Sequence, residues 1–187
     1  RQMQGSNPNA PGTPGTPAVP STVDKVSAGP RQADFVSRHS AAAAQVEREA
    51  GIPAGFMIGQ AGHETGWGRK EIRHADGSPS FNLFGIKADS LWRGQTLTMN
   101  TKEFIKGQWV VVPALWRKYP SWQASVDDHA AFLKRNPRYK ICFTCTTAQA
   151  FAKALAQAGY ATDPAYADKV IGLIKQHNLL VLDGDAP

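Results

Sequence analysis

Apolar residues recur at helical spacing over most of the chain beyond residue 30, and this pattern limits the possible folds more than any other feature does. Residues 31–50 show it first, and Gly51 supplies a stop signal. Three later segments repeat the pattern, each opened by a side chain that favours helix N-termini. These capping residues are Ser121, Thr147 and Asp163, the last followed by Pro164 at the first helical position. The sequence therefore predicts a domain that is mainly helical.

One stretch departs from the helical pattern. Residues 94–119 alternate apolar and polar side chains in two arms around Lys106–Gly107, which predicts a β-hairpin. A short apolar segment, FNLFGIKA at residues 81–88, precedes these arms. We expect a β-rich lobe at about residues 81–120, set between helices, and hence an α+β fold that is mainly α.

The first thirty residues have a different composition from the rest. Residues 1–30 are rich in Pro, Gly, Ser, Thr and Asn and show no periodicity, which predicts a disordered linker before a domain at residues 31–187. A linker joins two parts, and the chain opens at Arg1 without an initiator methionine. We therefore expect an upstream domain, and any signal peptide, to lie outside this sequence.

The chain is basic, with a formal net charge of +6 and a pI of about 9.5. This balance favours anionic partners such as nucleic acid, an acidic membrane surface or an anionic wall polymer. The basic residues are scattered and form no run of five, so we expect no nucleic-acid partner. No stretch reaches the roughly 18 apolar residues of a membrane span, so none is expected.

The motifs for metal and redox chemistry are incomplete. HETGW at residues 63–67 begins like a zinc-protease motif, but Trp67 occupies the place of the second histidine. Cys142 and Cys145 form one CFTC pair, and a zinc ribbon needs a second pair. The two cysteines form either a local disulfide or two free thiols. We expect no metal and no cofactor.

Glu64 is the candidate for carboxylate chemistry. It lies near the C-terminal end of a helix expected over residues 53–65, on one face with Met57, Gln60 and Ala61. The helix dipole disfavours a negative charge at that end, so the pKa of Glu64 should rise. A raised pKa suits a general acid, whereas an ordinary surface carboxylate gains no function from it.

Glycoside hydrolysis requires such an acid and a second group that handles water or stabilises the oxocarbenium ion. A sugar cleft also needs aromatic platforms. The aromatic residues near the expected cleft segments serve either as such platforms or as core. They are Trp67, Phe84, Trp92, Trp116, Tyr119 and Trp122.

Six separated blocks occur in a recognisable order. They are GQAGHETGWGRKEIR, FNLFGIKA, TKEF, WRKYPSWQASVDDHAAFL, NPRYK and AGYATDPAYADKV. In these blocks the chain resembles the peptidoglycan N-acetylglucosaminidases of glycoside hydrolase family 73, and it is most similar to members that act in flagellar rod assembly. The resemblance covers roughly residues 32–178.

The resemblance implies a lysozyme-like helical domain with a small β-hairpin lobe. It places the general acid at Glu64, the carboxylate of the β-lobe at Glu103, and a tyrosine that supports the reacting sugar at Tyr160. Asp127 and Asp128 are reserve candidates for the second carboxylate. The resemblance implies that the following residues line the cleft: Trp67, Asn82, Phe84, Gly85 and Tyr119.

The implied reaction is hydrolysis of the β-1,4 bond between N-acetylglucosamine and N-acetylmuramic acid. Either Glu103 activates water and inverts the anomeric centre, or the substrate's acetamido group attacks and Tyr160 assists with retention. If the lobe is mobile, Glu103 approaches only when substrate binds. The implied partners are peptidoglycan glycan strands and, through the upstream domain, flagellar rod proteins, which places the protein in the periplasm or outside the cell at the wall.

Three alternatives remain at this point. A lytic transglycosylase would carry a GLMQ-like block where this chain has NLFGIK at residues 82–87. A non-catalytic wall-binding module would be expected to have lost Glu64, which is present. A secreted autolysin or phage-type lysin would share the chemistry and differ only in biological role.

Overall fold

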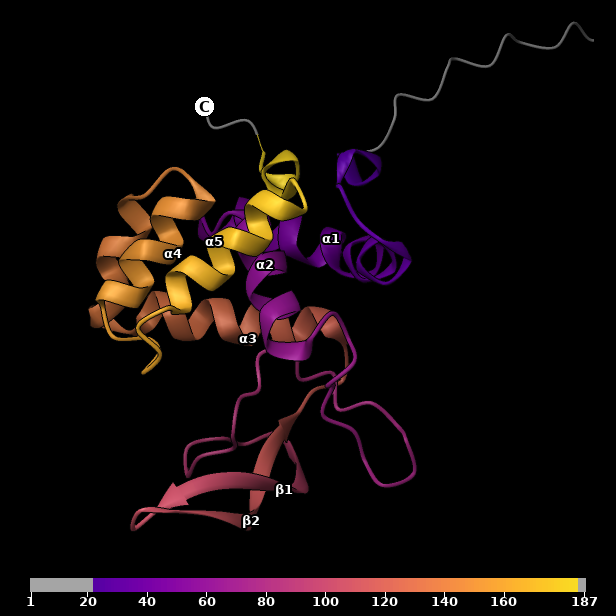
Figure 1. Ribbon diagram of the computed structural model, residues 1–187, viewed down its shortest axis with the longest axis vertical. Helices are drawn as coiled ribbons and strands as arrows, with labels where there is room; N and C mark the ends of the chain where they lie inside the picture. The colour runs from indigo at the N-terminus through magenta and orange to yellow at the C-terminus, as the bar shows by residue number, and fades with distance from the viewer. Residues whose placement is uncertain (1–21, 185–187) are drawn as a thin grey trace, which may run out of the picture.

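The computed structural model describes residues 22–184, which form a helical part and one β-hairpin (Figure 1). The α-helices are α1 Pro30–Ala50, α2 Ala54–Thr65, α3 Trp122–Arg135, α4 Ala148–Gln157 and α5 Tyr166–Gln176. The strands are β1 Gln95–Ile105 and β2 Gln108–Lys118. Short 3-10 helices are η1 Thr22–Lys25, η2 Pro137–Thr144 and η3 Leu179–Leu182. The predicted α+β class with a mainly helical content is confirmed.

Most helix ends lie where the capping signals predict. Gly51 ends α1 in the left-handed region, with φ of 76°, and its N–H bonds the carbonyl of Glu47 at 3.0 Å. The Ser121 hydroxyl accepts a hydrogen bond from the backbone N–H of Ala124 at 3.1 Å, and Thr147 caps α4 in the same way. Local side-chain chemistry is sufficient to set these boundaries.

Helix α5 begins at Tyr166, two residues later than predicted. Asp163 does not cap the helix directly. Its Oδ1 accepts from the backbone N–H of Ala165 at 2.9 Å, and its Oδ2 pairs with Lys169 at 2.6 Å. The residues around Pro164 therefore form a turn closed by the Asp163 side chain.

Helix α2 packs against α1, α4 and α5 and is buried over most of its length. Two glycines permit the close approach of its neighbours. A side-chain carbon at Gly55 would lie 2.6 Å from the carbonyl of Leu179, and one at Gly59 would lie 3.0 Å from Ile174. Because η3 and α5 pack directly on it, α2 is a rigid element, and it carries Glu64 in its last turn.

The hairpin predicted around Lys106–Gly107 is confirmed. The strands pair antiparallel with Glu103 opposite Val110, and the turn residues have positive φ values of 51° and 77°. Positive φ at both positions is the type I′ geometry that matches the twist of paired strands. One face of the hairpin base packs into a small second core, formed by Ile72, Leu97 and Trp116.

The domain begins earlier than the sequence predicts. Residues 22–30 belong to the predicted linker, yet η1 forms there and packs beside η3. The backbone N–H of Ser27 donates to the carbonyl of His177 at 3.0 Å, and Nδ1 of His177 bonds the Ser27 carbonyl at 2.8 Å. Val26 packs against the core, which offsets the entropy lost on ordering. The rest of the predicted linker, residues 1–21, lies outside the described residues.

The described residues also bear on the metal, redox and membrane alternatives. Cys142 is buried in η2 and Cys145 is half-buried just after it, and both are free thiols. Burial raises the pKa of the Cys142 thiol. Residues 22–184 contain no cluster of three or more His, Cys, Asp or Glu side chains placed to hold a metal ion. Within the same range no helix combines the length and the apolar character needed to cross a membrane.

Candidate active site

Glu64 lies in the last turn of α2, and Gly66 ends the helix with a φ of 58°. The helix dipole therefore gives its carboxylate no support. Glu64 is exposed at the surface as a whole residue, but neighbouring protein groups displace part of the water around its carboxyl. This partial burial raises the pKa of the Glu64 carboxyl above its ordinary value. The position thus favours the protonated form, which a general acid requires.

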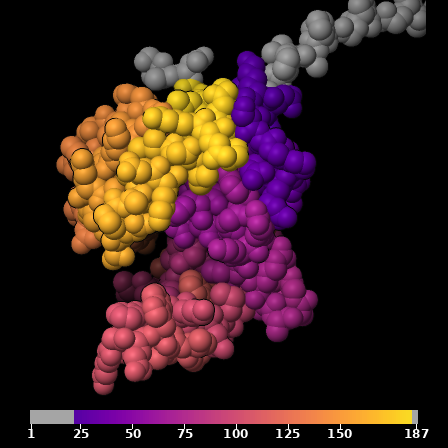
Figure 2. Space-filling model, viewed as in Figure 1, coloured from indigo at the N-terminus to yellow at the C-terminus, as the bar shows by residue number. Residues whose placement is uncertain are grey.

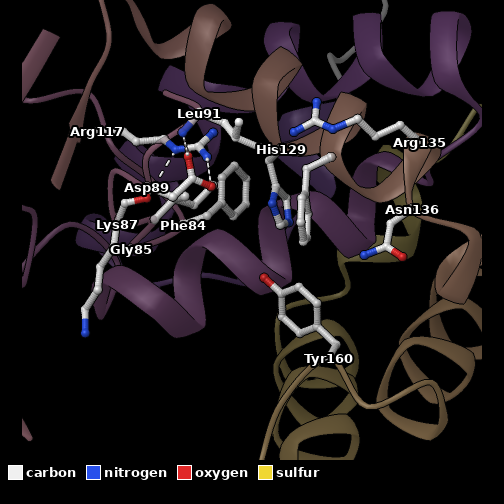
Figure 3. A pocket seen from close by; sticks show the side chains of 12 residues that line it. Phe84, Gly85, Lys87, Asp89, Leu91, Arg117, His129, Arg135, Asn136 and Tyr160 are labelled. Carbon is white, nitrogen blue, oxygen red and sulfur yellow. Dashed lines mark hydrogen bonds and ion pairs between the residues drawn. The ribbon is translucent and has the colours of Figure 1, made fainter. Parts of the chain in front are cut away.

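Gly85 lies directly opposite the Glu64 carboxylate. A side-chain carbon at Gly85 would be 3.7 Å from Glu64 Oε2, and the φ of 62° at this position favours glycine. Gly85 also lines a cavity of about 650 Å³, which Glu64 borders but does not line (Figure 3). The wall of the cavity consists of Phe84, Gly85, Ile86, Lys87, Asp89, Leu91, Arg117, His129, Phe132, Arg135, Asn136 and Tyr160. Two predicted cleft residues, Phe84 and Gly85, are therefore at the cavity.

Three tyrosine rings lie close together, and one of them, Tyr160, lines the cavity. Tyr160 follows α4 and reaches the cavity from the side opposite to Phe84 (Figure 3). Its ring centroid lies 5.5 Å from that of Tyr166 and 6.0 Å from that of Tyr139. Burial raises the pKa of Tyr160, and the nearby Tyr166 and Glu64 raise it further. Tyr160 therefore keeps its proton at neutral pH and can donate a hydrogen bond beside Glu64.

Gln60 lies one helical turn before Glu64 and joins three helices beneath the site. Its buried amide donates from Nε2 to the hydroxyl of Tyr166 at 2.7 Å, and its Oε1 lies 2.8 Å from Nε2 of His129. Because an amide oxygen only accepts, His129 carries its proton on Nε2. Its Nδ1 is buried without a hydrogen-bond partner among the described residues. Burial lowers the pKa of His129 to about 3, so the ring stays neutral.

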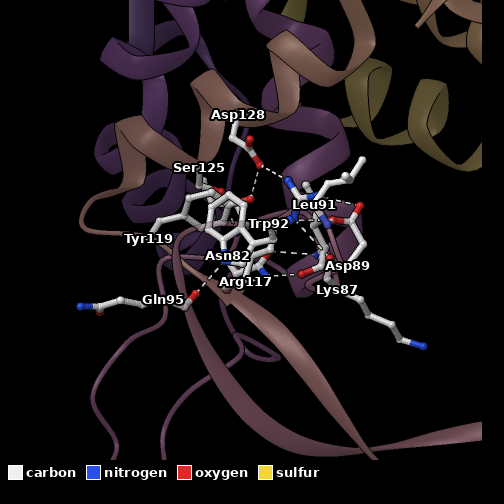
Figure 4. A network of polar contacts seen from close by, with 12 residues as sticks. Asn82, Lys87, Asp89, Leu91, Trp92, Gln95, Arg117, Tyr119, Ser125 and Asp128 are labelled. Carbon is white, nitrogen blue, oxygen red and sulfur yellow. Dashed lines mark hydrogen bonds and ion pairs between the residues drawn. The ribbon is translucent and has the colours of Figure 1, made fainter. Parts of the chain in front are cut away.

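Asn82 and Tyr119 were predicted to line the cleft, but the structure commits both to protein contacts (Figure 4). Asn82 Nδ2 donates to the carbonyls of Ile86 at 2.8 Å and Arg117 at 3.0 Å, and its Oδ1 accepts from Ile86 N at 3.0 Å. The Tyr119 hydroxyl donates to Asp128 Oδ2 at 2.5 Å. Both residues are buried and neither lines the cavity. They hold in place the base of β2 and the loop of residues 82–89, the cavity loop, which supplies part of the cavity wall.

Arg117 is the centre of this polar network (Figure 4). Its guanidinium donates to Asp128 at 2.8 Å and to Asp89 at 3.4 Å, and its Nε donates to the carbonyl of Lys87 at 3.2 Å. It also lies 4.6 Å from the ring centroid of Trp92. Arg117 thereby joins the hairpin base to α3 and to the cavity loop. Asp128, a reserve candidate for the second carboxylate, is taken up by these structural bonds.

Glu103 lies on β1, close to the hairpin turn, and forms an ion pair with Lys87. Lys87 lines the cavity, and its ammonium lies 5.8 Å from the ring centroid of Trp116. Among the described residues Glu103 has no hydrogen bond or ion pair with Glu64. The structure therefore does not bring the two predicted carboxylates into contact.

The two aromatic residues closest in sequence to the site motifs take different positions. Phe84 lines the cavity, where its ring stacks on His129 with centroids 4.1 Å apart. Trp67 is buried in the core instead, with its ring centroid 5.5 Å from that of Phe35 and 4.9 Å from that of His177. Trp67 therefore stabilises the turn after α2. Contrary to the prediction, it does not line the cavity.

Sequence reasoning gave no role to several residues that shape the site. They are Gln60, Lys87, Arg117, His129 and Tyr166. Gln60 had a local signal, because it precedes Glu64 by one turn on the same helix face. Tyr166 had none, since it lies 106 residues beyond its partner Gln60. Contacts at such separation cannot be read from a single sequence.

The hairpin forms a lobe that stands apart from the helices. Figure 2 shows a hollow on this face between the hairpin and the surface formed by α4 and α5. An open hollow suits an extended polymer that enters and leaves sideways. The adjoining groups offer a carboxyl with a raised pKa at Glu64, a neutral phenol at Tyr160 and cations at Lys87 and Arg135. This set can protonate a leaving group and hold an anionic chain.

Comparison with known proteins gives a consistent result. The family model named glucosaminidase, described as mannosyl-glycoprotein endo-beta-N-acetylglucosaminidase, matches residues 40–179. The peptidoglycan hydrolase FlgJ of Salmonella typhimurium is 41% identical over 143 residues, which are 76% of this chain. A probable N-acetylmuramidase of Lactococcus lactis is 33% identical over 156 residues, or 80% of this chain.

A solved structure supports the same relationship. The C-terminally truncated glycoside hydrolase domain of Salmonella typhimurium FlgJ has a TM-score of 0.69 and 40% identity. The match covers 76% of this chain and 95% of that domain. The predicted lysozyme-like fold is thereby confirmed. This chain spans 45% of the length of the full FlgJ relative and 34% of the Lactococcus lactis protein.

Proposed function

This chain belongs to the glucosaminidase family, and we propose that it hydrolyses the β-1,4 bond between N-acetylglucosamine and N-acetylmuramic acid in peptidoglycan. The observation that carries the proposal is the Glu64 carboxyl, whose pKa is raised by burial beside Gly85 and Tyr160. Names of relatives, among them peptidoglycan hydrolase FlgJ, support the polymer substrate.

Glu64 protonates the glycosidic oxygen as the bond to the leaving sugar breaks. General acid catalysis of this kind contributes about 10²–10⁴-fold to the rate. Gly85 leaves the carboxyl open toward the cavity, because a side chain there would cover it. Tyr160 donates a hydrogen bond to the reacting sugar from its neutral hydroxyl. Phe84 supplies an apolar wall.

The second role belongs to Glu103, acting as base for the attacking water and giving inversion. In the resting structure Glu103 is held by Lys87 on the hairpin, so the lobe must move toward Glu64 when substrate binds. The alternative route uses the acetamido group of the substrate in place of Glu103 and gives retention. The arrangement of Tyr160 beside Glu64 is compatible with either route.

The basic charge of the chain favours an anionic wall polymer, so the protein acts at the cell wall, in the periplasm or outside the cell. We assign it to opening the wall for flagellar rod assembly, with rod proteins as partners of an upstream domain. A secreted autolysin would use the same chemistry.

Product analysis on purified peptidoglycan tests the proposal. The digest is reduced with borohydride and the new ends are identified by mass spectrometry. Wild type is compared with Glu64→Gln and with Asp168→Asn, a control carboxylate exposed on α5. We expect reduced N-acetylglucosamine ends from wild type and the control, and almost none from Glu64→Gln.

The identity of the ends separates the alternatives. Reduced muramic ends would show an N-acetylmuramidase, the activity named for the Lactococcus lactis relative. Anhydromuramic ends would show a lytic transglycosylase. Full activity in Glu64→Gln would contradict the assignment of the general acid.

A further inference from the structure

The hairpin has an outer face that no part of residues 22–184 covers. Register places Phe104 opposite Trp109 and Lys102 opposite Val111 on this face, with Leu115 further along β2. Phe104 is 61% exposed and Trp109 is 71% exposed, and Val111 and Leu115 are also exposed. Exposed apolar side chains that gather in one place commonly mark a binding surface.

A contribution to hairpin stability does not fully explain why apolar side chains are exposed on this face. The ring centroids of Phe104 and Trp109 lie 5.3 Å apart, and such a cross-strand pair stabilises the hairpin. That pair accounts for two side chains at most. Val111 and Leu115 add apolar surface along the same strand, although water covers them and the opposite face already packs on the second core.

The charge of the outer face is of one sign. Lys102 lies on it and Lys106 lies at the adjoining turn, whereas the acidic residue of the hairpin, Glu103, points to the other face. A hollow of about 470 Å³ lies between Lys102, Trp109, Val110 and Val111. Flat apolar rings beside a cation complement a polymer that has both sugar rings and carboxylates.

We propose that the outer face of the hairpin binds a second stretch of peptidoglycan, apart from the stretch at Glu64. Sugar rings lie on Phe104 and Trp109, and carboxylates of the peptide stems pair with Lys102. The identity of the polymer rests on the proposed function, whereas the existence of the binding face does not.

The two sites can be filled together. Glu103 lies on the hairpin face that contacts the cavity residue Lys87, and Phe104 and Trp109 are on the reverse face. A strand held at the outer face raises the effective concentration of neighbouring wall at the cavity. The gain therefore applies to insoluble wall and not to short fragments.

Binding to insoluble peptidoglycan tests the proposal in a Glu64→Gln background, so that no wall is digested. The main variant is Phe104→Thr/Trp109→Thr, which places β-branched side chains, favourable in strands, at both positions. Ile141→Thr on η2 is the matched control, because Ile141 is 60% exposed and lies outside the hairpin. We expect the main variant to bind about tenfold more weakly and the control to bind normally.

Three further measurements complete the test. Lys102→Glu, which leaves the aromatic pair intact, should weaken binding at low salt and less so at high salt. With Glu64 restored, the main variant should hydrolyse a short soluble fragment at the wild-type kcat/KM. Thermal unfolding must show that both variants keep the fold.

Unchanged binding of folded Phe104→Thr/Trp109→Thr would overturn the proposal. Binding that is lost only together with a concentration-dependent dimer would assign the face to a second copy of the chain and overturn it as well. If Glu64 proves not to be catalytic but wall binding still depends on Phe104 and Trp109, the binding face stands without the proposed reaction.

Discussion

Gln60 donates a hydrogen bond from Nε2 to the hydroxyl of Tyr166 at 2.7 Å, and this bond ties α2 to α5 directly beneath Glu64. The other end of the amide engages His129 on α3 at 2.8 Å. One buried side chain therefore sets the spacing of three helices around the proposed acid. Buried polar groups of this kind stabilise a fold only when every partner is present.

Replacing Gln60 by Leu removes both hydrogen bonds and leaves Tyr166 and His129 unsatisfied. A buried polar group without a partner costs about 1–3 kcal/mol, so the free energy of unfolding should fall by at least that amount in urea titrations. Adding Tyr166→Phe to Gln60→Leu removes the unsatisfied hydroxyl. Relative to Gln60→Leu alone, the free energy of unfolding of this double variant should hardly fall, or should rise. Tyr139→Phe is the control, because Tyr139 forms no hydrogen bond with Gln60 and its effect should be additive.

The pH dependence of kcat/KM should report the pKa of Glu64. The acid acts when protonated, so the rate should fall as pH rises through that pKa, which burial places above the ordinary 4.5. Tyr160→Ala admits water to the carboxyl and lowers its pKa. The falling limb should then move to lower pH, whatever the change in the maximal rate. A limb that stays in place in Tyr160→Ala and in Glu64→Asp would show that another group titrates.

Glu103→Gln distinguishes the two catalytic routes. If Glu103 activates water, as we propose, kcat should fall by about 10²–10⁴-fold. The ion pair with Lys87 is partly exposed and is worth about 0–1 kcal/mol, so stability should hardly change. Lys87→Met is the matched control, because it removes the same ion pair and keeps the carboxylate. Equal small losses in both variants, with retention seen by NMR of the first product, would favour the acetamido route.

His39 should make the protein sensitive to acid. It is buried in α1 between Phe35 and Trp122, and neither ring nitrogen has a hydrogen-bond partner among the described residues. Burial, aided by the charge of Arg38 and opposed by Asp34, lowers the pKa of His39 to about 4 from an ordinary value of 6.5.

The sign of the effect follows from where the proton binds. Between pH 6.5 and about 4 the unfolded chain binds a proton at His39 and the native chain does not, so stability falls with falling pH. The slope approaches about 1.4 kcal/mol per pH unit for this group. His39→Leu should flatten the dependence of the free energy of unfolding on pH across this window. An identical slope in wild type and His39→Leu would show that His39 is not buried in its neutral form.

Local chemistry was enough to predict much of the architecture. Gly51 and Gly66 end helices because they adopt the left-handed region easily, and Ser121 and Thr147 begin them by capping. Lys106–Gly107 forms the hairpin turn. The predicted start of the domain at residue 31 was wrong. Residues 22–30 are held by contacts such as those of Ser27 with His177, which is too far along the chain to be paired with it from sequence.

In the candidate site, too, some residues could be named from local motifs, whereas the position of others depends on distant contacts. Its residues Glu64, Phe84, Gly85 and Tyr160 could be named from motifs, and the structure gathers them at one cavity or its edge. Trp67 was predicted to line the cleft but does not line this cavity, since an aromatic side chain after a helix packs inward or outward depending on its neighbours. In this structure Trp67 packs inward against Phe35 and His177.

The sequence by itself determined most of the helix boundaries, the hairpin and the place of Glu64 at a helix end, because each depends on residues within a few positions of one another. Only the tertiary structure decided which polar groups serve the fold and which remain for chemistry. Asn82, Tyr119 and Asp128 satisfy buried partners from distant segments, and that demand takes precedence because an unsatisfied buried group is costly. Glu64 forms no such bond within the described chain and therefore remains available to a substrate.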